Sequence, residues 1–220
     1  QMDGDNALTM TVPRLIDTPG ETTADLHVHT AMSSDAFISD TQRFQALAAA
    51  DVEAVVISDH NRMRDPRPAL EMLGMADDLQ AITGVEFRIG AAGKSIGHGN
   101  AFPLKPGVPA VRPKNKTPGE VFHAWRVHHR VNPIEGDETP VLIQLNHPRG
   151  IQFRADRKHR QDAHALFEEL DFNPRLPLRS HKDERVHKYW KSKEKRFLSF
   201  DAIEVLNRFS VAGWLQVRKD

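Results

Sequence analysis

Short apolar segments that end in a histidine or a carboxylate recur along this chain of 220 residues. Most are followed by a polar loop and then by a segment whose apolar residues have helical spacing. Alternation of strand and helix is typical of a parallel sheet covered by helices, with reactive residues at the carboxyl ends of the strands. The sequence therefore predicts an α/β protein with its site at one edge of the sheet.

Six segments have the pattern of a strand. The second is apolar throughout, as expected of a strand covered on both faces. In order they are residues 24–30, 54–57, 81–85, 95–102, 141–145 and 202–206. Between them, Ser39 and Thr117 each begin a capping box at the start of a helix, and residues 68–75 and 163–170 are further predicted helices.

Histidine is abundant, with 12 in the chain, and it is a common ligand for transition metals. His27 and His29 are two residues apart on a predicted strand, so both rings face the same side and can reach one ion. Asp35 lies in the following loop, where its carboxylate can turn back to that ion. Taken alone, Asp35 is more typical of a turn residue or of a neighbour of a helix cap.

The other candidate ligands follow later strands. Asp59 and His60 end a buried strand, where a charged pair is costly unless it has a role. Glu86 ends the next strand, and a carboxylate is suited to bridging two ions. His98 lies between two glycines, which we interpret as room for a ring at a crowded site. His147 precedes a proline, which stiffens the backbone beside it.

These candidates together predict a metal centre. They exceed the ligand shell of one ion, so we expect two or three divalent ions. Nitrogen and oxygen donors without sulfur suit zinc, manganese or iron, and the chain has no cysteine. We interpret the remaining histidines as solvated or packing residues: His123, His128, His129, His159, His164, His181 and His187.

Four short motifs carry a family resemblance: residues 25–30 (DLHVHT), 58–61 (SDHN), 84–87 (GVEF) and 146–148 (NHP). Together they resemble the PHP superfamily, which is named for polymerase and histidinol phosphatase. The resemblance extends from about Asp25 to Asn207. The stretch 97–104 (GHGNAFPL) is similar to a subgroup of large, often multidomain metallohydrolases.

The resemblance implies a distorted (β/α)7 barrel, similar to a TIM barrel, with a trinuclear metal centre that hydrolyses phosphoesters. It assigns the ligands to His27, His29, Asp35, His60, Glu86, His98 and His147. The family's last motif, Asp-x-His, does not occur between Asn207 and Asp220. We therefore expect an incomplete barrel, and a native protein that continues past Asp220 into that motif.

Other residues receive supporting roles. Arg149 is predicted to clamp a substrate anion, and Asp59 to act in catalysis or to orient a ligand. Glu204 and Asn207 are predicted to hold ligands from behind. Two further functions stay open: the same centre hydrolysing a carbamate, amide or ester, and a non-catalytic module that the metals stabilise.

Composition and organisation bound the function further. Lysine plus arginine equals aspartate plus glutamate, at 30 each, so the net charge gives no attraction to nucleic acid. We expect a small, anionic substrate, no required nucleic acid and no membrane span, since no apolar run reaches about 20 residues. The protein is expected to be soluble, with a removed export signal left open. Residues 1–23 are interpreted as a lead-in or the end of a preceding module, 24–220 as the barrel, and about 151–199 as a basic insertion.

Overall fold

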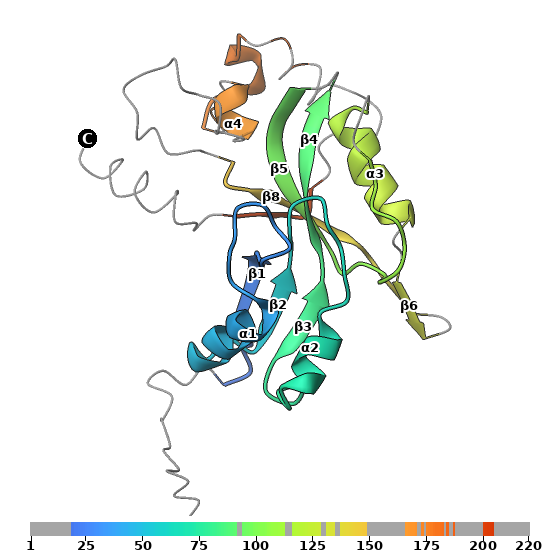
Figure 1. Ribbon diagram of the computed structural model, residues 1–220. Coiled ribbons are helices and arrows are strands. Elements are labelled where there is room, and N and C mark those ends of the chain that lie inside the picture. The colour runs from blue at the N-terminus through green and yellow to red at the C-terminus, as the bar shows by residue number, and fades with distance from the viewer. Residues whose placement is uncertain are drawn as a thin grey trace, which may run out of the picture.

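The computed structural model of the protein describes residues 19–91, 94–112, 116–128, 131–134, 137–148, 166–170, 173, 175–182, 184, 187 and 200–204. These residues contain a three-stranded, a four-stranded and a two-stranded sheet (Figure 1). The strands are β1 (Ala24–Val28), β2 (Ala54–Ile57), β3 (Gln80–Thr83), β4 (Val85–Ala91), β5 (Lys94–Phe102), β6 (Val131–Ile134), β7 (Asp137–Thr139), β8 (Leu142–Asn146) and β9 (Ala202–Ile203). The helices are α1 (Asp40–Ala49), α2 (Arg67–Met72), α3 (Pro118–His128), α4 (Leu166–Glu169) and a 3-10 turn at Leu178–Ser180.

The first sheet is parallel, in the order β1-β2-β3, and α1 and α2 lie beside it (Figure 1). All four residues of β2 are buried, which confirms that the strand is covered on both faces. Phe44 and Leu47 of α1 and Leu70 of α2 pack in one core cluster with Val28 and Val55 of the strands. Burying side chains of this size supplies about 1.5–3 kcal/mol each, enough to order the short helices.

The second sheet has the order β4-β5-β8-β9 and contains both antiparallel and parallel pairs. Its strands alternate between an apolar face and a polar face. Phe87 of β4 and Leu145 of β8 pack against Trp125 of α3 and Leu166 of α4 in the larger core cluster. Glu86, directly before Phe87, and Asn146, directly after Leu145, alternate with these apolar residues along the strands and are buried on the opposite face. The site is built on that polar face.

Gly84 joins the two sheets between β3 and β4. Its backbone N–H donates to the carbonyl of Ile57, and the Glu86 N–H then donates to the carbonyl of Ser58. A Cβ at Gly84 would lie 2.4 Å from Cγ1 of Val56 and 3.3 Å from the carbonyl oxygen of Ala101. Only glycine lets the chain pass this closely between its neighbours, and this approach brings Glu86 beside the end of β2.

The predicted (β/α)7 barrel is wrong, because the described residues form three small sheets, only one of which is all-parallel. β4 pairs antiparallel with β5, and β5 pairs antiparallel with β8. β4 ends at Ala91 and β5 begins at Lys94. A parallel crossover needs about a dozen residues or more, so this short connection only allows an antiparallel turn.

Local predictions fared better than the architecture. Both capping boxes are confirmed: Ser39 exchanges hydrogen bonds with Gln42, and Thr117 with Glu120. The helix predicted over 68–75 ends at Met72, and the strand predicted over 81–85 is divided at Gly84. The pair β6 and β7 was not predicted. Arg149 and Asn207, to which the sequence assigned roles, lie outside the described residues.

Candidate metal centre

Five imidazoles surround the carboxylate of Glu86, which is 1% exposed. Its Oε1 lies 3.4 Å from His27 Nε2, 3.2 Å from His98 Nδ1 and 3.3 Å from His147 Nε2. Its Oε2 lies 3.0 Å from both His29 Nε2 and His60 Nδ1. The structure therefore brings five of the seven predicted ligands to the buried carboxylate of a sixth, Glu86, and the seventh, Asp35, contacts two of these imidazoles.

Strand geometry explains how these side chains meet. His27 and His29 alternate with Val28, which is turned into the core. His60 forms an isolated bridge with Glu86 immediately after β2. In the second sheet, His98 of β5 stands opposite Asn146, directly before His147.

The glycines beside His98 have a different role from the one predicted. A Cβ at Gly97 would lie 3.0 Å from Cβ of Leu166, and one at Gly99 would lie 3.1 Å from the ring of Phe87. The crowding is thus on the core face of β5, away from the imidazole. These glycines let α4 and β4 pack closely against the strand that carries the ligand.

Three of the imidazoles have a carboxylate at each ring nitrogen. Beyond Glu86, His27 Nδ1 lies 3.1 Å from Glu204, His29 Nδ1 lies 3.1 Å from Asp35, and His60 Nε2 lies 3.2 Å from Asp35. A neutral imidazole has only one N–H to donate. A neutral ring can therefore donate to only one of its two carboxylates, and its other nitrogen is then available to bind a cation.

In the ion-free cluster, the contacts between imidazoles and carboxylates shift the pKa values of both. Burial lowers the pKa of His27, but hydrogen bonds to Glu204 and Glu86 outweigh burial and raise it to about 10. The pKa of His60 is also raised, because its contacts with Glu86 and Asp35 outweigh burial. Burial alone would raise the pKa of Glu86, yet hydrogen bonds from His147 and the other imidazoles hold it well below its usual value.

The spacing and chemistry of these donors fit metal ions. Two ligands about 2.1 Å from one ion lie about 3.0 Å apart in octahedral and about 3.4 Å apart in tetrahedral geometry. The contacts around Glu86 have the same spacing. Three overlapping groups have donor atoms within 4.8 Å of one another: His27, His29 and Glu86; His29, Asp35 and His60; and His60, Glu86 and His98. Because the groups share members, ions bound to them would be bridged.

Glu204 lies behind the cluster, as its predicted supporting role requires. Its Oε1 is 3.1 Å from His27 Nδ1, and its Oε2 accepts from the backbone N–H of His147 at 2.6 Å. A carboxylate at the far nitrogen of an imidazole fixes the ring's tautomer and orientation. Glu204 thereby holds the positions of two candidate ligands, His27 on β1 and His147 directly after β8.

Two buried amides complete the cluster, and sequence reasoning gave neither a role. Asn146 Nδ2 donates to Glu86 Oε1 at 2.9 Å and to Asn100 Oδ1 at 2.7 Å. Asn100 Nδ2 donates to the carbonyl of Leu26 at 2.8 Å, which ties the second sheet to β1. The available signal was an asparagine on the polar face of each of two apolar strands, because such a group must find partners when buried.

Asp59, predicted to be catalytic, is hydrogen-bonded to Thr30. Its two oxygens accept from the backbone N–H of Thr30 at 2.6 Å and from its hydroxyl at 2.8 Å. Both residues are buried. In this position Asp59 fixes the start of the loop between His29 and Asp35, and its catalytic role stays a prediction.

We expect Asp59→Ala to lower the free energy of unfolding by about 3 kcal/mol, because it leaves two buried donors of Thr30 without an acceptor. Urea unfolding measures the change. Asp77→Ala, at an exposed position, is the matched control and should be nearly neutral. Equal stability of the two variants would rule out the loop-fixing role.

The described histidines outside the cluster differ in their exposure to solvent. His123 is exposed on α3, which agrees with its predicted solvated role. His181 is buried, and its Nε2 lies 3.0 Å from both the backbone nitrogen and the carbonyl oxygen of Asn173, consistent with packing.

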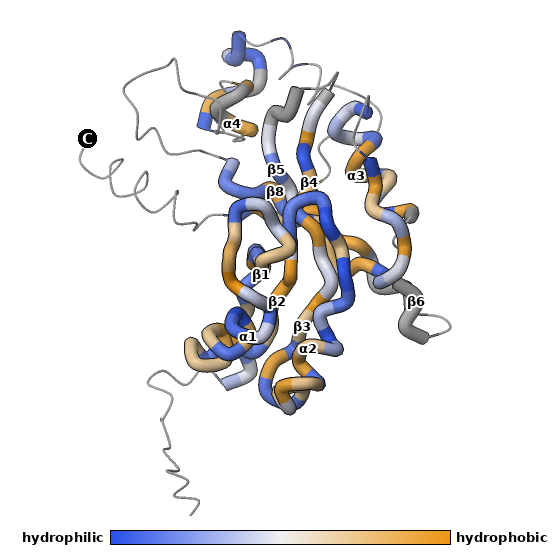
Figure 2. The backbone as a smooth tube through the Cα atoms, viewed as in Figure 1, coloured by the Kyte–Doolittle hydropathy of each residue, from blue (hydrophilic) through white to orange (hydrophobic). Residues whose placement is uncertain are grey.

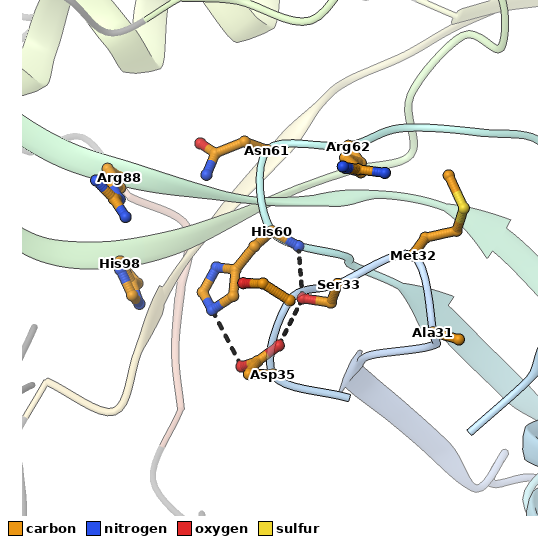
Figure 3. A pocket seen from close by; sticks show the side chains of 10 residues that line it. Ala31, Met32, Ser33, Asp35, His60, Asn61, Arg62, Arg88 and His98 are labelled. Carbon is orange, nitrogen blue, oxygen red and sulfur yellow. Dashed lines mark hydrogen bonds and ion pairs between the residues drawn. The ribbon is translucent and has the colours of Figure 1, made fainter. Parts of the chain in front are cut away.

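A cavity of about 430 Å³ opens beside the cluster (Figure 3). Its lining residues are Ala31, Met32, Ser33, Ser34, Asp35, His60, Asn61, Arg62, Arg88 and His98. The segment between β2 and α2 that contributes to it is largely hydrophilic, in contrast to β2 itself (Figure 2). The size lies within the range of small-molecule sites, and the lining favours a polar ligand.

No protein-family model and no curated protein matches the sequence. The resemblance to the PHP superfamily therefore stays an expectation from four motifs, and function has to be argued from the site. Among the helices that the structure describes, none is long and apolar enough to cross a membrane.

Proposed function

We propose that the protein is a metal-dependent hydrolase of the PHP type, and that its substrates are phosphoesters. The observation that carries this proposal is the group of five imidazoles around the buried carboxylate of Glu86. A buried carboxylate with so many imidazoles is costly without ions, because several rings must then be charged in a confined space. With two or three ions, the same donors are satisfied as ligands.

Divalent ions at this site, zinc, manganese or iron, would supply an activated water and neutralise the phosphoryl oxygens of a substrate. The protein fixes the positions of the imidazoles that would bind these ions. Glu86 holds the imidazoles in register from both of its oxygens, and Glu204 fixes His27 from behind. Asp35 is 51% exposed and lines the cavity, so its carboxylate stands where substrate enters.

An anionic substrate is favoured over a neutral one by the cavity itself. Arg62 and Arg88 are exposed and line it together with His60 and His98. Guanidinium groups recognise anionic groups such as phosphate and carboxylate through paired hydrogen bonds and fixed charge. This lining supports an anionic substrate over the neutral carbamates, amides and esters that a similar centre could also hydrolyse.

We expect the purified chain to bind two or three divalent ions and to hydrolyse an aryl phosphate faster than an aryl carbamate. His27→Ala should lose bound metal and lower turnover at least about 100-fold, because it removes a ligand and the contact that orients it. Metal content by mass spectrometry and release of the aryl group measure the two effects.

His123→Ala, an exposed histidine on α3, is the matched control and should keep both metal and turnover. Unchanged metal stoichiometry in His27→Ala would refute the metal centre. Turnover that survives complete removal of metal by a chelator would refute the mechanism, and faster carbamate turnover would refute the substrate class.

A further inference from the structure

Two arginines at the cavity have no carboxylate partner among the described residues. Among the other described arginines, Arg64 pairs with Asp40, Arg67 with Asp65 and Arg126 with Asp201, whereas Arg43 donates to the carbonyl of His29. Arg62 and Arg88 are exposed, and both line the cavity beside the candidate metal centre. Unpaired guanidinium groups gathered at a cavity leave it with a positive charge that a ligand can meet.

The sheet fixes where one of these charges stands. Arg88 follows Glu86 by two residues on β4, so both project from the same face, about 7 Å apart along the strand. Arg88 is paired in register with His98 on β5. It therefore stands one step beyond the metal cluster, on the cavity side.

The second charge lies across the cavity. Arg62 follows His60 by two residues, in the segment between β2 and α2. Figure 3 shows Arg88 beside His98 on one side of His60, and Arg62 beside Met32 on the other. The two guanidinium groups thus flank the candidate ligands and do not converge on a single point within them.

The carboxylates of the cluster already have partners within it. The carboxylates of Glu86, Asp35 and Glu204 contact imidazoles, and bound ions would serve the hydrolysed group of the substrate. The flanking arginines are left for a group that lies further along the substrate. A small molecule that fills a polar cavity of about 430 Å³ is large enough to carry one.

We infer that Arg62 and Arg88, one on each side of the candidate ligands, bind anionic groups of the substrate, phosphate or carboxylate, that are not themselves hydrolysed. The inference rests on the proposed phosphoesterase function and narrows it. The substrate class is a small, hydrophilic phosphate ester with at least one further negative charge.

Two non-hydrolysable probes test this directly. Methylphosphonate carries one anionic group, and phosphonoacetate adds a carboxylate at a short distance. Calorimetry on the metal-loaded chain should show phosphonoacetate binding about tenfold more tightly, the effect of one charged hydrogen-bonded contact. In the double variant Arg62→Met/Arg88→Met this preference should be lost, while the affinity for methylphosphonate stays unchanged.

Arg67→Met is the matched control, because Arg67 is an exposed arginine that pairs with Asp65 and does not line the cavity. Equal binding of the two probes by the unaltered chain would overturn the inference. So would an equal loss of both probes in the double variant, which would place the arginines on the hydrolysed group.

The binding ratio is independent of turnover, so the two proposals can fail separately. A metal-loaded chain that prefers phosphonoacetate but hydrolyses no phosphate ester would contradict the proposed function alone. A chain that hydrolyses phosphate esters and binds the two probes equally would contradict the arginine site alone.

Discussion

Glu86→Gln will lose most of its bound metal and its turnover, because one buried carboxylate faces five imidazoles from both of its oxygens. Glutamine keeps the volume of the side chain but removes the charge. Its amide nitrogen would also point a donor at nitrogens that must be free to bind an ion. We expect metal affinity to fall by at least about 100-fold, more than for removal of an outer contact.

The comparison for this variant is Glu71→Gln, an exposed glutamate on α2. Both variants remove one negative charge, so a general effect of net charge on metal binding would appear in both. Competition with a chelator of known affinity measures the difference. If Glu86→Gln retained the full metal content at matched affinity, Glu86 would not be the centre of the site.

Metal binding will release protons at neutral pH and will become tighter as the pH rises. The pKa of His27 is about 10 in the ion-free cluster, and that of His60 is raised as well. At pH 7 His27 therefore carries a second proton, which an ion must displace before it can bind that ring. Each displaced proton changes the apparent affinity about tenfold per pH unit.

The ion-free fold should respond to pH in the opposite direction. Because the folded pKa of His27 is raised, its contribution to the stability of the ion-free fold is full below about pH 6.5, its unfolded pKa, and is lost as the pH rises through about 10.

The protons released on metal binding are counted by calorimetry of metal binding in two buffers with different heats of ionisation. Heats that do not depend on the buffer between pH 7 and 8.5 would contradict the expected protonation.

The half of the fold with helices between its strands could be predicted from the sequence. The segments that became β1, α1, β2 and β3 alternate as a parallel sheet requires, and they form one. The prediction of parallel strands fails for the part of the chain that follows Glu86. The predicted strands at 81–85 and 95–102 are separated by too few residues for a helical crossover, and this spacing excluded a barrel of parallel strands.

The candidate ligands were readable because each belongs to a local pattern, such as the alternation of His27 and His29 around Val28. The supporting contacts were not readable in the same way. Asn146 reaches Glu86 across 60 residues of sequence, and Asn100 reaches Leu26 across 74. The sequence around each asparagine does not indicate its hydrogen-bond partner, because the register and direction of distant strands determine which residues meet. Asp59 is a case in which a local pattern was readable but its role was not. It is a charged residue at the end of a strand, and its hydrogen bonds to the backbone N–H and hydroxyl of Thr30 explain its position.

The contact between His27 and Glu204 spans 177 residues of sequence. During synthesis, the first of these residues leaves the ribosome long before the second. Closing so long a segment adds little entropic cost for each further residue, but it cannot happen until the later strand exists. The nascent chain thus exposes His27 early, and this imidazole acquires its full orientation only after Glu204 has been synthesised. An ion captured before that point would be held by a partial set of donors, so correct loading has to wait for the segment that carries Glu204.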